Sequence, residues 1–326
     1  MNRSTFNGSV IFGLIPLLSP VSLLAYVVFF LYIIIYLNKK NIIALSIALL
    51  VFVLFFIGRS NLLTNFSSEF FNALNWTMAF SLLMLSPFYR MKLLLSPSVV
   101  TDSLLIVYLS MCMVFAILGI PFEALLQIST FALILYLVTS TTWKRRLFLI
   151  FPIIISGART LWGGALYSLA AVNFPKLHRF SSIFLVALLS LLILSGLLTD
   201  MISLLLSTLM DNQIYLKGRT IYWASMAEFA NTLFGHGIGT SLIVLKEKME
   251  VMRLPHNDWL RIYVDLGGIP LLLVASALIF NSFRGEIQMV ASILLGFYML
   301  MGNPLSFPQV MVVYLLVLDA QIVGKK

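Results

Sequence analysis

Long apolar runs separated by short polar breaks make up most of the chain. Four of these runs, residues 21–37, 41–57, 103–120 and 181–198, hold hardly a charge. With a rise of about 1.5 Å per residue, helices of about 17–20 residues approach or span a hydrocarbon core of roughly 30 Å. The runs lack the two-residue alternation of a membrane β-barrel. The pattern therefore predicts membrane-spanning α-helices, which satisfy their own backbone groups inside lipid.

The complete set of apolar runs predicts eleven helices in a single domain, residues 1–326. These helices cover residues 21–37, 42–57, 70–88, 102–120, 121–140, 148–155, 161–172, 181–198, 260–280, 287–302 and 310–323. A twelfth helix over 9–18 stays open, and no cleavable secretory signal is evident. The predicted fold class is all-α: a polytopic integral membrane bundle with one large external loop over 199–258.

Composition and charge agree with this prediction. Hydrophobic residues make up 61% of the 326 positions and charged residues 10%, with a mean hydropathy of +1.04. A soluble globule has too much surface to bury such a fraction. The chain has a net charge of +9. Many of its basic residues fall in short loops on one side of the predicted spans, at Lys39–Lys40, Arg90 and Lys92, Lys144–Arg146, Lys176 and Arg179, Arg284 and Lys325–Lys326. This positive-inside pattern predicts cytoplasmic loops and argues against nucleic acid as a partner.

A break between two short apolar runs carries the first candidate site residue. Residues 148–155 and 161–172 are each too short to span, and they meet at Ser156-Gly157-Ala158-Arg159. Non-helical backbone at membrane depth is tolerated only inside protein or beside water, so we expect Arg159 to face an external cavity. An arginine at mid-membrane costs at least about 2.5–3.5 kcal/mol on insertion scales. Anion binding is the favoured role, and snorkelling to the outer surface is the alternative.

The external segment predicts an amphipathic helix over 220–233, with Arg219 at its start and Gly235 as its stop. Its apolar stripe consists of Ile221, Met226, Phe229, Ala230 and Leu233. Such a helix either caps a cavity or lies on the membrane surface. Guanidinium groups suit bidentate capture of phosphate oxygens, so Arg159 and Arg219 are predicted to share one diphosphate.

Two motifs near the end of the external segment carry the candidate chemistry. They are Gly235-His236-Gly237-Ile238-Gly239-Thr240-Ser241 and Pro255-His256-Asn257-Asp258-Trp259-Leu260. An imidazole can accept a hydroxyl proton at neutral pH, and His256 begins an apolar helix at the membrane surface. The alternative for His256 is a helix cap or an interfacial residue, and His236 is interpreted as part of a glycine turn. His178 is predicted to contact lipid head groups on the cytoplasmic side.

Neither a metal nor a cofactor is predicted. The chain has no Asp-x-Asp pair and no His-x-x-x-His, and Cys112 is its only cysteine. Glu247 and Glu250 alternate with lysines, a pattern typical of a solvated face. Because the glycines of 235–239 do not follow a strand of a βαβ unit, they are not a dinucleotide motif.

In order and spacing, these motifs resemble the O-antigen polymerase and O-antigen ligase superfamily. The pattern of that family is Gly-x-Gly-x-Ser, then His-Asn-x-x-Leu, then an acidic or polar group with Leu-Gly in the next span. The matching positions are Gly237, Gly239 and Ser241, then His256, Asn257 and Leu260, then Asp265, Leu266 and Gly267. The resemblance also includes Gly218-Arg219-x-x-x-Trp223 and covers roughly residues 148–273, while the N-terminal half agrees only in hydropathy.

The resemblance implies a metal-independent glycosyltransferase of GT-C-like architecture in the bacterial inner membrane, with its active site facing the periplasm. Its donor and acceptor would be undecaprenyl-diphosphate-linked oligosaccharides, and membrane lipid and a chain-length co-polymerase would be further partners. Arg159 and Arg219 would hold the diphosphate, and His256 would activate the acceptor hydroxyl. The supporting residues would be Gly237, Gly239, Asn257, Asp265 and His236.

Several activities remain open on these motifs. A polymerase transfers the glycan to another lipid-linked repeat unit, whereas a ligase transfers it to the lipid A core. We favour the polymerase because polymerases are the more numerous and divergent members. A polysaccharide flippase is the alternative of another class, although transporters usually place their polar groups near the midplane. A scaffold without a site would require His256 and both arginines to be incidental.

Overall fold

The computed structural model describes the C-terminal two thirds of the chain most fully. The described residues are 68–88, 93–95, scattered positions between 106 and 138, 143–155, 159–212, 219–230, 233–249, 256–318 and 320–322. Over this part the chain is almost entirely helical, which confirms the all-α prediction. The helices predicted over 9–18, 21–37 and 42–57 lie outside the described residues.

Four apolar helices form the centre of the molecule: α4 (Ser68–Leu85), α14 (Gly268–Ser282), α15 (Glu286–Met301) and α16 (Pro308–Leu318). A short 3-10 turn, η2 (Ser86–Phe88), extends α4 and completes the run predicted over 70–88. The side chains that these helices turn toward one another form one continuous buried cluster. Close packing of these side chains holds the four helices together.

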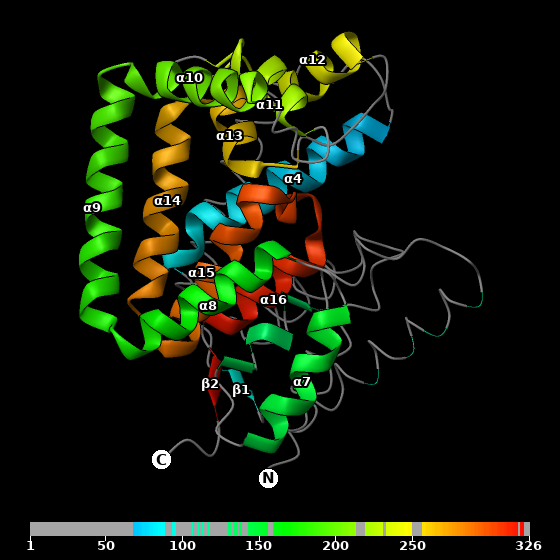
Figure 1. Cartoon of the computed structure of the whole chain (residues 1–326), viewed down its shortest axis with the longest axis vertical. Helices are drawn as coiled ribbons and strands as arrows, with labels where there is room; N and C mark the ends of the chain where they lie inside the picture. The colour runs from blue at the N-terminus through cyan, green and yellow to red at the C-terminus, as the bar shows by residue number, and fades with distance from the viewer. Residues whose placement is uncertain are drawn as a thin grey trace.

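The two short helices predicted around residue 157 are present on either side of residues 156–158, which are not among the described residues. They are α7 (Trp143–Ile155), which begins earlier than predicted, and α8 (Arg159–Asn173). Helix α8 crosses α15 (Figure 1). The approach is close because a Cβ added at Gly164 would lie 3.1 Å from the Cβ of Phe297.

The helix predicted over 181–198 is wrong at both ends. Helix α9 (Pro175–Leu194) begins earlier because proline suits the first turn of a helix. It ends at a turn in which Gly196 has φ of 77°, in the left-handed region that glycine adopts without strain. The chain then enters α10 (Leu197–Asp211), which lies across the end of α9 (Figure 1). Much of the segment predicted as a loop from Thr199 onward is therefore helical.

A layer of short helices covers the upper end of the bundle in Figure 1. It consists of α10, α11 (Arg219–Ala227), α12 (Thr240–Met249) and α13 (Asp258–Leu266). The helix predicted over 220–233 ends at Ala227, so Gly235 does not stop it. Ala230 and Leu233 of the predicted stripe still pack against the core, but they do so from irregular backbone, and Phe229 is exposed. We call these four helices the cap layer.

The helix predicted over 260–280 is divided into α13 and α14 at Gly267. Gly267 has φ of 96°, and a Cβ there would lie 2.4 Å from the carbonyl oxygen of Leu233. A Cβ on Gly235 would lie 2.3 Å from the backbone carbon and oxygen of Asp265. The segment around Gly235 therefore packs backbone against backbone on the α13–α14 junction. Only glycine permits this approach at both positions.

Alanine at this contact is expected to be strongly destabilising. Because the clashing atoms are backbone, Gly235→Ala should lower the free energy of unfolding by about 3 kcal/mol or more. Gly163→Ala is the matched control. Among the described residues its Cβ would meet the Phe297 ring alone, at 3.7 Å, and alanine favours a helix. Thermal unfolding in detergent checks the pair. Equal midpoints for the two variants would contradict the close contact.

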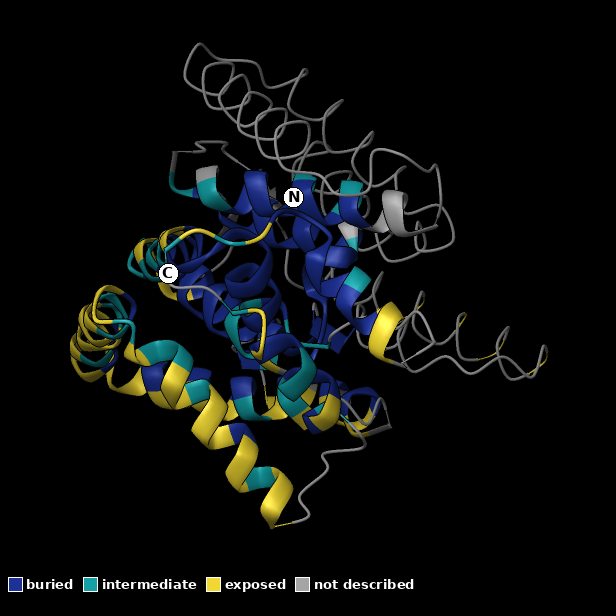
Figure 2. Cartoon of the chain, turned by 90° about the horizontal axis from the view of Figure 1, so that it is seen from above, coloured by how far each residue is buried: buried dark blue, intermediate teal, exposed yellow. Residues whose placement is uncertain are grey.

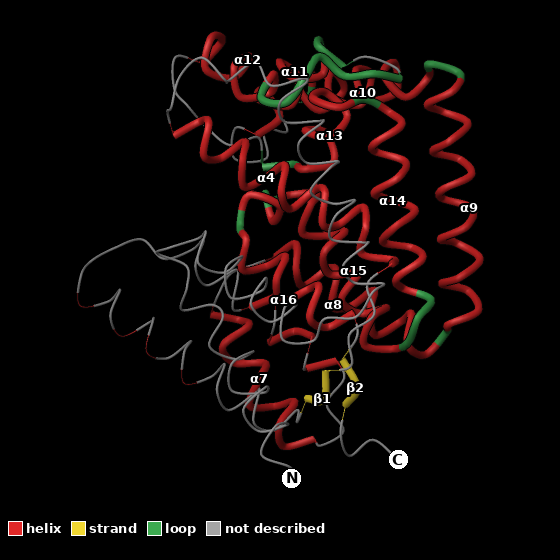
Figure 3. The backbone as a smooth tube through the Cα atoms, turned by 180° about the vertical axis from the view of Figure 1, so that it is seen from behind, coloured by secondary structure: helices red, strands yellow, loops and turns green. Residues whose placement is uncertain are grey.

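The C-terminal helix is also shorter than predicted. A 3-10 turn, η4 (Pro304–Ser306), joins α15 to α16, and α16 ends at Leu318 instead of continuing to residue 323. The strand β2 (Ala320–Ile322) then pairs in parallel with β1 (Leu93–Leu95) (Figure 3). Backbone pairing between these two segments supplies hydrogen bonds that a longer helix would otherwise provide.

Among the described residues, α9 alone is long and apolar enough to cross a membrane, and α14 and α15 are shorter apolar helices. Only 17% of the most apolar 18-residue window of α9 is buried. A soluble core helix of this composition would be covered by its neighbours. Instead, large apolar side chains are exposed along α9 and α10, and Figure 2 shows exposed positions gathered on the outer helices.

Candidate functional site

Helix α13 organises the candidate site, and Asn257 begins it. The Asn257 side chain accepts a hydrogen bond from the backbone N–H of Leu260 at 3.0 Å, the geometry of a helix N-cap. Asn257 also lines the large cavity described below. The interpretation of His256 as the helix cap is therefore wrong, because the cap is the next residue.

His256 stands out by its backbone conformation. Its φ of 54° is the only positive value at a residue other than glycine among the described residues. Histidine tolerates this left-handed region better than bulky residues do, but the conformation is uncommon. The half-buried His256 ring lies against the side chain of Asn303, with Nδ1 3.5 Å from the amide nitrogen. Unusual backbone held in place by its surroundings is typical of functional positions.

The glycine motif wraps around the opposite end of α13. The Asp265 carboxylate accepts hydrogen bonds from the Gly239 N–H at 3.2 Å and from the Ser241 N–H at 2.7 Å. It is also paired with the Ser241 hydroxyl at 3.2 Å, and the Gly237 N–H donates to the Asp265 carbonyl oxygen at 2.9 Å. Gly237 and Gly239 have φ of 111° and 90°, which lets their backbone follow the carboxylate. The motif therefore supports α13 and does not reach the His256 end.

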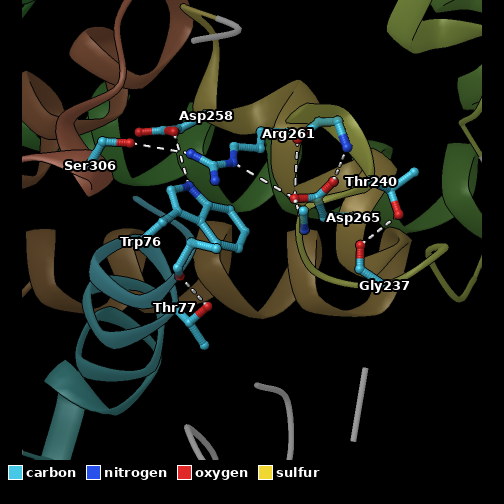
Figure 4. Close-up of polar contacts among 11 residues, drawn as sticks. Trp76, Thr77, Gly237, Thr240, Asp258, Arg261, Asp265 and Ser306 are labelled. Atoms are coloured by element: carbon cyan, nitrogen blue, oxygen red, sulfur yellow. Dashed lines mark hydrogen bonds and ion pairs between the residues drawn. The ribbon is translucent and has the colours of Figure 1, made fainter. Parts of the chain in front are cut away.

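A buried charged cluster runs along α13 between these two ends (Figure 4). Arg261 lies between two carboxylates, with its Nε 3.7 Å from Oδ2 of Asp265 and its Nη1 donating to Ser306 Oγ at 3.2 Å. Its guanidinium stacks over the Trp76 ring at 4.5 Å, an interaction that favours a cation. Asp258, Arg261 and Asp265 are all fully buried. The cluster fixes α13 to α4 and to the α15–α16 corner.

Asp258 joins three elements through its carboxylate. It accepts hydrogen bonds from Trp76 Nε1 at 3.1 Å and from the Leu305 N–H at 2.9 Å. Burial raises the pKa of Asp258 to about 7, although the Arg261 charge and these two donors favour the ionised form. Because the partners belong to α4, η4 and α13, the charge of Asp258 depends on the assembled site.

An apolar cavity of about 800 Å³ runs alongside α9 and α14. At the lower end of Figure 1 it is lined by His178 and Ser282, near the start of α9 and the end of α14. At the upper end it is lined by Trp223 and Asn257, beneath the cap layer. Nearly all of the lining between the two ends is aliphatic or aromatic. A cavity with this lining suits an apolar ligand.

The two predicted arginines are carried by helices in different parts of the molecule. Arg159 is exposed at the first residue of α8, and Arg219 is half-buried at the first residue of α11. Figures 1 and 3 both show α8 below the layer that contains α11. Arg219 stands one helical turn before Trp223, so the two share a face of α11. Trp223 lines the upper end of the cavity, and Arg219 is not among the lining residues. The convergence of both arginines on one diphosphate stays a prediction.

The remaining histidines have different surroundings. His236 is exposed, and its ring meets the edge of Phe229 with centroids 6.4 Å apart. His178 is buried, with Nε2 3.2 Å from Ser282 Oγ and Nδ1 3.4 Å from the Tyr167 hydroxyl. The prediction that His178 contacts lipid head groups is therefore wrong for its ring, because these hydrogen bonds turn it inward to join α8, α9 and α14.

Sequence reasoning missed Asp258, Arg261 and Trp76. A signal was present, because Asp258, Arg261 and Asp265 recur at intervals of three and four and so share one face of a helix. Charges on one face within an apolar run indicate a buried ionic cluster. Trp76 carries no such signal, since its indole meets Asp258 only through the tertiary fold.

The chain matches no protein-family model, no curated protein and no solved structure.

Proposed function

We propose that the chain is a glycosyltransferase of the bacterial inner membrane that polymerises a surface polysaccharide on a lipid carrier at the periplasmic face. The observation that carries this proposal is the apolar cavity that ends at Asn257, beside the unusual backbone of His256. An apolar lipid tail occupies the cavity, and its sugar diphosphate lies at the cap layer. One site then brings a lipid-linked donor next to a potential base.

The membrane setting is supported by the outer helices. With 20 residues, α9 is about 30 Å long, which matches the hydrocarbon core, and its apolar side chains are exposed. Lys176 and Arg179 at its first turns, and Arg284 after α14, mark the lower end as basic. Positive charge on that side favours a cytoplasmic lower end and a periplasmic cap layer.

The chemistry assigned to the site is base-assisted glycosyl transfer. His256 Nε2 accepts the proton of the acceptor hydroxyl as that oxygen attacks the anomeric carbon of the donor sugar. The bond from the anomeric carbon to the diphosphate oxygen breaks, and undecaprenyl diphosphate leaves with the electron pair. Arg219 stabilises the charge that develops on the leaving group. The imidazolium then releases its proton to water.

The acceptor is a second lipid-linked repeat unit, and a deletion strain tests this assignment. Loss of a polymerase leaves single repeat units on the lipid A core, as seen on a gel of extracted lipopolysaccharide. Long chains that stay on the lipid carrier would instead identify a ligase. Absence of repeat units from the core, with short units retained on the carrier, would point to a flippase. A strain with an unchanged glycan pattern would contradict all three assignments.

A further inference from the structure

The corner between α15 and α16 forms one wall of the His256 site. Asn303 begins this corner and is 2% exposed. Its backbone carbonyl oxygen accepts a hydrogen bond from the Ser306 N–H at 2.9 Å. The corner is attached to α13 twice, because Leu305 N–H donates to Asp258 and Arg261 donates to Ser306 Oγ. Asn303 is therefore held firmly against the first residues of α13.

The amide of Asn303 faces the ring of His256. Its Nδ2 lies 3.5 Å from His256 Nδ1, while its Oδ1 is buried and has no hydrogen-bond partner among the described residues. The two ends of an asparagine amide are exchanged by a half-turn of the group, and the hydrogen-bond network decides between them. After this half-turn, Asn303 Oδ1 lies against His256 Nδ1 and can accept a hydrogen bond from the Nδ1–H.

The orientation of this amide determines which ring nitrogen carries the proton. If Nδ2 donates to Nδ1, the neutral ring keeps its proton on Nε2, which then cannot accept another. If Oδ1 accepts from the Nδ1–H, Nε2 is unprotonated and can act as a base. We propose that Asn303 is a positioning residue that accepts a hydrogen bond from Nδ1–H and holds His256 in the tautomer with a basic Nε2. The inference rests on the proposed role of His256.

The surroundings make Asn303 well suited to this task. Residues 302–307 contain no ionisable side chain, so this corner faces His256 without a charge of its own. Among the described residues, the titratable groups packed around the corner are Asp258 and Arg261 on α13 and Tyr298 on α15. Tyr298 lies within electrostatic reach of Asp258. Both carboxylate oxygens of Asp258 already accept from Trp76 and Leu305. A substitution at Asn303 therefore changes the side chain that contacts His256 Nδ1.

The tautomer can be measured without any activity assay. The chain has three histidines, so protein labelled with ¹⁵N-histidine gives three pairs of ring signals. The variants His256→Asn and His236→Asn assign them by loss of one pair each. We expect the neutral His256 ring of the wild-type protein to carry its proton on Nδ1. The Asn303→Asp variant should keep this tautomer, and the Asn303→Leu variant should lose it. A ring protonated on Nε2 in the wild-type protein would overturn the proposal.

Rates of glycan transfer give the second readout. We expect Asn303→Leu to lower kcat by about 10–100-fold, the scale seen when the orienting partner of a metal-bound histidine is removed. Asn303→Asp should retain most activity and move the acidic limb of the pH–rate profile to higher pH, because a carboxylate stabilises the imidazolium. Loss of activity in Asn303→Leu with the wild-type tautomer retained would overturn the proposal.

A buried asparagine elsewhere serves as the matched control. Asn281 is fully buried and donates to Ser86 and Tyr314 at the lower end of the bundle. Asn281→Leu should lower thermal stability while leaving the His256 tautomer and the pH–rate profile unchanged. A changed His256 tautomer or a shifted pH–rate profile in Asn281→Leu would show that Asn303 acts only through the general fold. An active His256→Asn enzyme would instead overturn the proposed role of His256 as the base, whatever the tautomer.

Discussion

Replacing Asp265 with asparagine is expected to lower the free energy of unfolding by about 3–5 kcal/mol, the cost of breaking a buried ion pair. The carboxylate is fully buried, lies 3.7 Å from Arg261, and accepts from the N–H groups of Gly239 and Ser241. An amide of the same shape turns an NH₂ group toward one of these donors. It also leaves the buried guanidinium with less negative charge nearby.

Denaturant or thermal unfolding of the purified protein in detergent measures this effect. Asp200→Asn is the matched control, because Asp200 is an exposed acid in the first turn of α10 and should change stability by only a few tenths of a kcal/mol. In the double variant Arg261→Met/Asp265→Asn the loss should be smaller than the sum of the two single losses, since the pair shares one interaction. If Asp265→Asn is no less stable than Asp200→Asn, the carboxylate does not hold α13 in place.

Helices of the central bundle could be predicted from the sequence because a long apolar run favours a buried or membrane-spanning helix. The runs over 70–88 and 287–302 became α4 with η2 and α15 within two residues at each end. The long run over 260–280 was divided into two helices by its backbone conformation, which a hydropathy pattern does not report. Gly267 takes a positive φ where another segment of backbone packs against it.

The cap layer was predicted less well because its helices are short and depend on tertiary contacts. Helices of about ten residues are marginal alone and form when an amphipathic face is buried. Neither α10 nor α12 was expected, and α11 ended before the predicted stripe did. Trp223 and Met226 of α11 pack with Leu245 and Leu260 from other helices of the layer.

The candidate site could be predicted as a set of motifs but not as an arrangement. The order of the glycine and His-Asn motifs indicated one site, and the structure does bring both onto α13. It places them at opposite ends of that helix, so Gly237 and Gly239 support Asp265, while His256 meets Asn303 from a distant part of the chain. Contacts across 47 residues depend on the packing of α13 against η4, which local spacing does not reveal.

His256→Asn is expected to reduce glycan transfer by about 10²–10⁴-fold, the usual contribution of a positioned base. Asparagine is the informative replacement because it is among the residues that tolerate a φ of 54°, so the backbone at this position is retained. Alanine would add backbone strain to the loss of the imidazole. The helix cap is unaffected, since Asn257 supplies it. The purified variant should therefore unfold at the wild-type temperature and still bind the lipid-linked donor.

Transfer by the purified enzyme and the chain length of the surface glycan both report on this variant. His236→Asn is the matched control, because His236 is exposed and contacts only the edge of Phe229 among the ring partners described. It should keep a long-chain ladder, whereas His256→Asn should show single repeat units. The reason for the difference is chemical, since a sugar hydroxyl is a weak acid and an amide cannot take its proton. A normal ladder from a stable His256→Asn protein would show that the imidazole is not the base, and that its unusual backbone serves only the turn into α13.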